Sequence, residues 1–315
     1  MANFFEYTII VSLFVGMLRT AMPIVYAAMG ELVAERAGIL NLGLEGMILL
    51  GAFVGFMVAY FSGSLWLGVA AAVLAGALLG AFIAFVVATL RVDQIMAGLA
   101  INLLIGGLTS FGFRLAFRTM GGENPAVIST FGVFKIPLLS QIPFFGEVLF
   151  SQHALTYIGL LLVPVISVFL YRTRYGLELR AVGDNPRAVD MKGVSVTLRQ
   201  YLALMFAGAL AAIGGAFLCL ASTGIFVPLI SNGRGWLAIA LVIFGNWRPR
   251  WILFGALFFG LIDSVQLSLQ TLGVSLPYQL LLASPYLLTI MALVVYRSRS
   301  HRPLWLGVPY YRETR

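Results

Sequence analysis

Long apolar stretches, separated by short polar connections, dominate this sequence. The stretch from Leu65 to Leu90 exceeds the roughly 20 residues that an α-helix needs to cross a bilayer. Such stretches predict membrane-spanning helices at residues 8–29, 40–60, 65–90, 94–117, 154–171, 200–221, 235–247, 251–272 and 278–296. The seventh is short for a full crossing, and residues 30–40 have room for a half-helix. We therefore expect an all-α integral membrane protein, a polytopic helical bundle of about nine (eight to ten) transmembrane helices.

The composition supports this fold class. Hydrophobic residues make up 61% of the chain and charged residues 10%, whereas a soluble domain carries about 25% charged residues. A soluble protein with one very large core is a poor alternative, because single cores stop growing near about 250–300 residues. No loop is long enough to fold alone, so residues 1–315 are expected to form a single transmembrane domain. The first stretch is longer than a signal-peptide core and is expected to be retained.

The basic residues are distributed unevenly, although the net charge is +8. One cluster lies between two predicted spans and consists of Arg172, Arg174, Arg180, Arg187, Lys192 and Arg199. Because Lys and Arg are enriched in cytoplasmic loops, residues 172–199 are predicted to be cytoplasmic and residues 118–153 external. With nine spans the N-terminus lies outside, and a tenth crossing near residues 30–40 would bring it inside. This rule accounts for the positive charge, so no nucleic-acid partner is expected.

Residues 35–46, with the sequence Glu-Arg-Ala-Gly-Ile-Leu-Asn-Leu-Gly-Leu-Glu-Gly, introduce polar groups where the second span begins. Asn41 and Glu45 are four residues apart and would share one face of a helix. The glycines favour a helix break or a close backbone approach, and broken helices in membranes line a cavity or are buried in protein. Two interpretations stay open. The segment is either a discontinuous helix beside a solute pathway or a helix start whose charges lie among lipid headgroups.

A polar stripe marks the fourth span, where Gln94, Gly98 and Asn102 recur every fourth residue. Such a stripe should face protein or water, because it would be costly against lipid. It could bind a polar solute, or it could hold helices together as interhelical polar residues often do. By contrast, the Gly76-x-x-x-Gly80 pair in the third span is typical of simple helix packing.

The eighth span carries Asp263, three residues before Gln266 and on the same face. An acid at the bilayer centre costs about 2.5–3.5 kcal/mol on insertion scales, so Asp263 is a functional candidate, or else a structural hydrogen-bond partner. Glu45 lies near a helix start, which leaves Asp263 as the only expected mid-span acid. The candidates for a translocation path are Asn41, Glu45, Gln94, Asn102, Asp263 and Gln266.

The basic loop contains the signals of a short helix. Asn185 is a good N-cap, Pro186 suits the first helical position, and Gly193 is a good terminator. A helix of about two turns is unstable alone in water, so it needs a docking partner or packing against the spans. An alternative is that it simply lies on the membrane surface.

Several kinds of chemistry have no signature here. The sequence lacks the glycine-rich loop that binds ATP, and its only lysines are Lys135 and Lys192. No Ser/His/Asp set or zinc-ligand spacing is present, and the single cysteine, Cys219, cannot form an internal disulfide. We therefore expect neither an enzyme nor a bound metal or cofactor in this chain.

These motifs resemble those of permeases of the ribose, branched-chain amino acid and nucleoside group of ABC importers. The resemblance is carried by residues 35–46, 94–109 and 179–188, and extends to residues 233–236 and 285–289. The first two segments are most similar to the nucleoside and simple-sugar branch. Branched-chain amino acid permeases typically have His in place of Leu44 and Gly in place of Glu45, which argues against amino acids.

The resemblance implies a permease subunit in the bacterial inner membrane that takes up a nucleoside or a simple sugar. It implies three partners: a second homologous permease in a heterodimer, a cytoplasmic ATPase that binds ATP and Mg, and an external solute-binding protein. It also implies that the 185–193 helix is the coupling helix to the ATPase, with Arg180, Gly183, Asn185, Pro186, Arg187, Ala188 and Gly193. The alternatives are an ion-coupled secondary transporter, a branched-chain amino acid ABC permease and a non-transporting membrane subunit.

Overall fold

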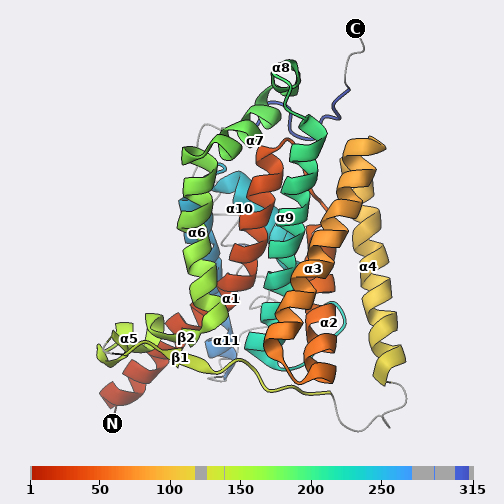
Figure 1. Cartoon of the computed structure of the whole chain (residues 1–315). Helices are drawn as coiled ribbons and strands as arrows, with labels where there is room; N and C mark the ends of the chain where they lie inside the picture. The colour runs from red at the N-terminus through yellow and green to blue at the C-terminus, as the bar shows by residue number, and fades with distance from the viewer. Residues whose placement is uncertain (1, 118–125, 138, 272–286, 288–301, 312–315) are drawn as a thin grey trace.

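The structure, a computed structural model, describes residues 2–117, 126–137, 139–271, 287 and 302–311. Within these residues, seven helices are long and apolar enough to cross a membrane (Figure 1). They are α1 (Ala2–Arg36), α2 (Leu44–Ser62), α3 (Leu65–Ala84, continued by a π-helical turn at Phe85–Thr89), α4 (Gln94–Phe117), α6 (Ala154–Arg172), α9 (Val196–Phe217, continued by a π-helical turn at Leu218–Thr223) and α11 (Pro249–Thr271).

Shorter elements connect these helices. They are a strand pair, β1 (Val133–Lys135) and β2 (Ser151–His153), a 3-10 turn at Leu139–Gln141, and the helices α5 (Phe145–Leu149), α7 (Arg174–Asp184), α8 (Pro186–Met191) and α10 (Arg234–Phe244). The two strands are antiparallel, with Val133 opposite His153. Helix α10 corresponds to the seventh predicted span and is short, as expected. The ninth predicted span, 278–296, lies outside the described residues apart from residue 287, so the described chain does not test the count of nine.

The expected half-helix or tenth crossing near residues 30–40 is wrong. Helix α1 continues without a break to Arg36, and residues 37–43 form a non-helical connection to α2. Hydropathy placed the end of the first span too early because Glu31 and Glu35 interrupt the apolar pattern. Both side chains are fully buried in the bundle, where protein rather than lipid surrounds them.

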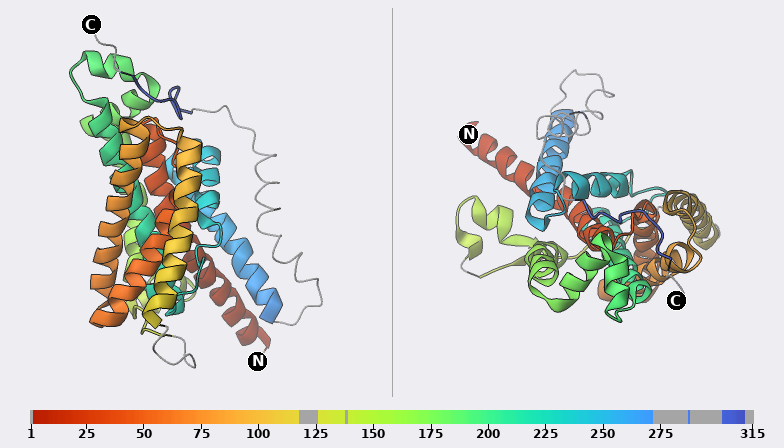
Figure 2. Two further views of the ribbon diagram at one scale, coloured as in Figure 1. Left: turned by 90° about the vertical axis from the view of Figure 1, so that its right-hand side faces the viewer. Right: turned by 90° about the horizontal axis from the view of Figure 1, so that it is seen from above.

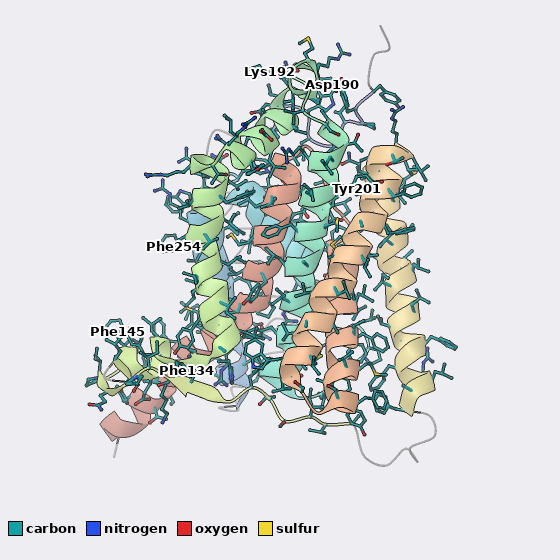
Figure 3. All side chains as sticks on the ribbon, in the orientation of Figure 1. Phe134, Phe145, Asp190, Lys192, Tyr201 and Phe254 are labelled. Carbon is teal, nitrogen blue, oxygen red and sulfur yellow. The ribbon has the colours of Figure 1, made fainter. Side chains whose placement is uncertain are left out.

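The two ends of the bundle are distinct. Helices α7 and α8 lie at one end with residues 302–311, whereas the N-terminus, the strand pair and α5 lie at the other (Figure 1). The labelled side chains agree: Asp190 and Lys192 lie at the first end, and Phe134 and Phe145 at the second (Figure 3). The predicted cytoplasmic segment 172–199 and the described part of the predicted external segment are therefore at opposite ends.

Helix α9 lies at the centre of the bundle and packs against α1, α2 and α3. Helix α11 runs obliquely beside α1 (Figure 2), and Ser264 on α11 donates a hydrogen bond to the carbonyl oxygen of Leu13, at 2.9 Å. The contact between α3 and α9 is made by small residues. A Cβ atom added at Gly76 would overlap the carbonyl oxygen of Gly208, and one added at Gly80 would overlap that of Leu204. The Gly76-x-x-x-Gly80 pair is thus confirmed as a packing surface.

We expect Gly76→Ala to lower the thermal unfolding temperature of the purified protein. The added methyl group must separate the α3 and α9 backbones, and overpacking of this kind costs about 1–3 kcal/mol. Gly107→Ala is the matched control, because a Cβ atom at this helical position meets nothing within 4 Å. That control should be neutral or slightly stabilising, since Ala is the better helix former. Equal unfolding temperatures for the two variants would contradict the packing described here.

Candidate functional site

Residues 37–43, which we call the break, connect α1 to α2 inside the protein. Gly38 has φ of 84°, in the left-handed region that favours glycine. Glu31 and Glu35, which precede the break, have exposed fractions of 0%, and Asn41 within it has 2%. Protein encloses Glu35 and Asn41, which contradicts, for these two residues, the interpretation that places the polar groups of this segment among lipid headgroups.

The predicted polar stripe of α4 faces this break. Gln94 Oε1 accepts a hydrogen bond from the backbone N–H of Leu40, at 2.8 Å. Asn102 binds the backbone twice: Oδ1 accepts from the Gly46 N–H at 2.8 Å, and Nδ2 donates to the Leu42 carbonyl oxygen at 2.6 Å. The carboxamides of the stripe thus satisfy backbone groups that the break leaves without helical partners.

Gly98, the third member of the stripe, permits this close approach. A Cβ atom there would lie 2.7 Å from Leu42 Cβ and 2.8 Å from the backbone nitrogen of Gly43. The prediction that the stripe faces the bundle interior is confirmed. Gln94 Oε1 and both polar side-chain atoms of Asn102 are engaged with the backbone of the same chain.

Glu31 was missed by the sequence analysis because the first predicted span stopped at residue 29. Its Oε1 atom accepts a hydrogen bond from the backbone N–H of Asn41 at 3.0 Å. The side chain of Asn41 turns back on the break, where Oδ1 accepts from the Gly43 N–H at 3.1 Å. Glu31 is thus a buried acid inside a span, but it lies near the end of the Tyr7–Arg36 span and not at its middle, so the expectation that Asp263 is the only mid-span acid stays a prediction.

Glu45, in the first turn of α2, caps a different helix. Its Oε1 accepts from the Gly233 N–H at 2.8 Å and its Oε2 from the Gly235 N–H at 2.6 Å. These N–H groups open α10, whose 11 residues extend about 16 Å at 1.5 Å per residue. A carboxylate suits this place, because helix N-termini present unpaired N–H groups and positive potential.

The opposite end of α10 is also tied to the α1–α2 region. The indole Nε1 of Trp247 donates to Glu35 Oε2 at 2.5 Å. The Trp247 carbonyl oxygen accepts from the Tyr171 hydroxyl at 2.8 Å and from Arg36 at 3.2 Å. Carboxylates on either side of the break, Glu35 and Glu45, therefore hold the two ends of this short helix.

Asp263 and Gln266 lie on α11. Asp263 accepts a hydrogen bond from Thr20 of α1 and has Arg234, at the start of α10, as its cationic neighbour. Gln266 is buried. Asp263 thus lies near the start of α10, whereas Gln94 and Asn102 hold the break, so the six path candidates divide into separate groups.

The predicted short cytoplasmic helix is present as α8, Pro186–Met191. Asn185 Oδ1 accepts from the Ala188 N–H at 3.1 Å, so Asn185 is the N-cap, and Pro186 occupies the first turn. Gly193 follows the helix with φ of 76°, the left-handed conformation expected of a terminating glycine. All three end signals read from the sequence are confirmed.

A small apolar cluster holds α8 in place. Val189 of α8 packs with Val182 of α7 and Val196 of α9, and Tyr310 covers the cluster. This packing supplies the tertiary support that a helix of six residues requires. The helix therefore packs against α7 and α9 instead of merely lying on a membrane surface.

The other coupling candidates have different surroundings. The Arg180 guanidinium lies over the Tyr171 ring, at 5.0 Å from its centroid. Gly183 packs so closely on the end of α1 that a Cβ atom would overlap the Arg36 carbonyl oxygen. Arg187 is exposed and Ala188 is half-buried, while Met191 is 75% exposed. The exposed side of α8 thus combines a basic and an apolar side chain.

Comparison with known proteins agrees with this architecture. A putative glucose ABC transporter permease protein of Haloferax volcanii is 38% identical over 82% of this chain and 78% of its own length. A guanosine ABC transporter permease protein of Bacillus subtilis is 34% identical, covering 94% of this chain and 95% of its own. A nucleoside ABC transporter permease protein of Lactococcus lactis subsp. cremoris is 32% identical, covering 94% and 96%.

Haloferax volcanii and Lactococcus lactis each have a second, more distant relative, at 28% and 24% identity. A solved structure described as an inward-facing conformation of a putative metal-chelate type ABC transporter has a similar fold. The TM-score is 0.51 with 16% sequence identity, and the match covers 92% of this chain and 87% of that one. Residues 13–293 match the family described as branched-chain amino acid transport system, permease component. This chain therefore belongs to that family of ABC transporter permeases, which are transport subunits and not enzymes.

Proposed function

We propose that this permease imports a nucleoside, with a simple sugar as the second candidate. The observation that carries the proposal is the near full-length similarity, over 94% of this chain, to permeases named for guanosine and nucleosides. The glucose permease covers less of the chain, although its identity is higher. Leu44 and Glu45, in place of the His and Gly typical of amino acid permeases, add support from the sequence.

We further propose that the break and α10 shape the solute path. Discontinuous helices near the membrane midplane are where many transporters bind their solutes. The start of α10 lies near Thr20, which falls close to the middle of the Tyr7–Arg36 span. The position of these backbone segments would be set by Gln94, Asn102, Asn41 and Glu45. Two further polar side chains, Asp263 and Gln266, would be contributed to the path by α11.

The proposed assembly contains this chain, a second homologous permease, a cytoplasmic ATPase and an external solute-binding protein, in the bacterial cytoplasmic membrane. The paired relatives in two organisms support a heterodimer. ATP and Mg would bind to the ATPase, since this chain lacks the ATP-binding loop.

Helix α8 is proposed to be the contact with the ATPase. We expect Ala188→Trp to reduce solute-stimulated ATP hydrolysis by the reconstituted complex. A bulky ring at this half-buried position should overpack the contact between α8 and the ATPase, and overpacking costs about 1–3 kcal/mol. Met191→Ala is the comparison variant. It only shortens an exposed side chain of α8, so its effect on ATP hydrolysis should be smaller than that of Ala188→Trp. Solute binding on the external side should not change. Wild-type ATPase association and hydrolysis in Ala188→Trp would remove α8 from the coupling role.

A competition experiment tests the solute class. Cells that express the whole transporter take up labelled guanosine, and unlabelled nucleosides, glucose, ribose and leucine are added in excess. The proposal predicts competition by nucleosides alone. Competition by glucose or ribose would favour the sugar branch, and competition by leucine would favour an amino acid permease.

An ion-coupled transporter is the rival function, and the buried Glu31 is the observation in its favour. Membrane-embedded acids often serve as ion sites. Glu31 is engaged with the break through Asn41, which supports a structural role instead. Guanosine uptake that collapses with an ionophore while cellular ATP is maintained would favour the rival.

A further inference from the structure

The last described segment, residues 302–311, crosses the end of the bundle that carries α8. Its backbone is bound at two places. The Trp305 N–H donates to the Gly183 carbonyl oxygen at 2.8 Å, and the Gly307 N–H donates to the Gly38 carbonyl oxygen at 3.1 Å. The segment, which we call the tail, therefore joins the end of α7 to the first residues of the break.

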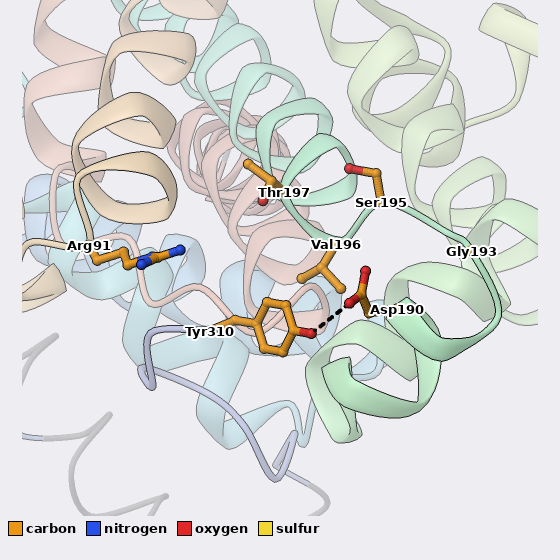
Figure 4. A pocket seen from close by; sticks show the side chains of 7 residues that line it. All are labelled: Arg91, Asp190, Gly193, Ser195, Val196, Thr197 and Tyr310. Carbon is orange, nitrogen blue, oxygen red and sulfur yellow. Dashed lines mark hydrogen bonds between the residues drawn. The ribbon is translucent and has the colours of Figure 1, made fainter. Parts of the chain in front are cut away.

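The far end of the tail binds α8 directly. The Tyr310 hydroxyl donates to Asp190 Oδ2 at 3.1 Å, as the dashed line in Figure 4 shows. The Tyr310 ring also packs on the valine cluster that holds α8 to α7 and α9. Beside this contact lies a cavity of about 170 Å³, with Arg91 and Thr197 on its wall.

Two cation–π contacts strengthen the attachment of the tail. The Arg187 guanidinium of α8 lies 5.9 Å from the centroid of the Trp305 ring. Arg91, in the connection between α3 and α4, lies 4.6 Å from the centroid of the Tyr311 ring. Both distances fall within the range of cation–π attraction. The tail thus contacts α7, α8, the break and the α3–α4 connection.

These contacts form a continuous path from the surface to the middle of the bundle. Gly38 and Gly183 approach so closely that a Cβ atom on Gly38 would lie 3.4 Å from Gly183 Cα. From Gly38 the break leads within a few residues to Glu45, which caps α10. A shift of α8 has a direct physical route to α10 through the tail and the break.

We propose that the tail is a coupling strap, with Tyr310 and Trp305 as positioning residues that transmit movement of α8 to the break. The inference rests on the proposed function, because it assumes that an ATPase moves α8. Without the strap, α8 would still be held by its valine cluster and its covalent neighbours. Its displacement would then reach Gly38 only through α7.

The test uses the whole reconstituted transporter in proteoliposomes and measures the guanosine transported per ATP hydrolysed. Tyr310→Phe removes the hydroxyl that binds Asp190 and keeps the ring in the cluster. Tyr311→Phe is the matched control. It removes a hydroxyl from the next residue and keeps the ring over which Arg91 lies. We expect the transport ratio to fall about three- to tenfold in Tyr310→Phe, the range for one lost hydrogen bond, and to stay at the wild-type value in Tyr311→Phe. ATPase association should be unchanged in both.

A double-mutant cycle separates transmission from a general structural effect. In an Asp190→Ala background, Tyr310→Phe should cause no further loss, because the bond is already absent. A full additional loss in that background would overturn the pairing. Equal ratios in Tyr310→Phe and wild type would overturn the strap while leaving the importer intact. If the wild-type complex shows no guanosine-coupled hydrolysis, the proposed function itself fails, and the strap fails with it.

Discussion

Glu45→Gln is expected to abolish most guanosine uptake and to lower the thermal unfolding temperature of the protein. The glutamine keeps one acceptor for the Gly233 N–H but turns an NH₂ group toward the Gly235 N–H, so donor meets donor. Hydrogen bonds to charged groups contribute about 1.5–3 kcal/mol, and an unsatisfied buried donor adds about 1–3 kcal/mol. Uptake by cells and unfolding of the purified protein measure the two effects.

Asp93→Asn is the matched control for this prediction. Asp93 also caps a helix N-terminus: its Oδ1 accepts from the N–H groups of Ile95 at 3.0 Å and Met96 at 2.9 Å. It is exposed, and Asn is about as good an N-cap as Asp, so little change is expected. A Glu45→Gln variant as stable and active as Asp93→Asn would contradict the role assigned to the Glu45 carboxylate.

Asn102→Leu should be the most damaging single change in α4. It leaves the Gly46 N–H and the Leu42 carbonyl oxygen without their side-chain partner. Each unsatisfied buried group costs about 1–3 kcal/mol, so the loss of both should cost about 2–6 kcal/mol. The break should then keep only the Gln94–Leu40 hydrogen bond to α4, and guanosine uptake should fall even where folded protein persists.

Leu103→Ala tests the same helix on the side away from the break. Leu103 is 80% exposed in this chain, so trimming it should change unfolding and uptake little. Uptake per folded molecule is the quantity to compare, with the folded fraction measured by size-exclusion chromatography in detergent. Normal uptake in Asn102→Leu would mean that the break does not depend on this carboxamide.

Local signals in the sequence predicted the described spans and the ends of α8. Apolar runs of sufficient length identify spans because the bilayer sets a fixed length. Asn185, Pro186 and Gly193 act on the backbone next to them, so their effect can be read without tertiary structure. The same holds for the stripe of Gln94, Gly98 and Asn102, whose spacing alone requires an interior position.

The sequence alone could not predict which groups these polar side chains bind. Glu45 binds N–H groups 188 and 190 residues away, and no local pattern indicates such a pairing. Hydropathy also misplaced the end of α1, because it cannot distinguish Glu31 enclosed by protein from an acid at a membrane surface. The tail contacts depend on the same long-range packing, since Tyr310 and Asp190 are 120 residues apart.

As a permease subunit of an ABC importer, this chain should carry solute inward with energy from ATP hydrolysed on a separate subunit. The most direct measurement is uptake of labelled guanosine into proteoliposomes that contain the purified permease pair and its ATPase, with the binding protein on the side opposite the ATPase. We expect uptake that requires ATP on the ATPase side, stops when the ATPase is omitted, and is unaffected by ionophores. Uptake driven by a proton or sodium gradient in the absence of ATP would show instead that this chain is not part of an ATP-driven importer.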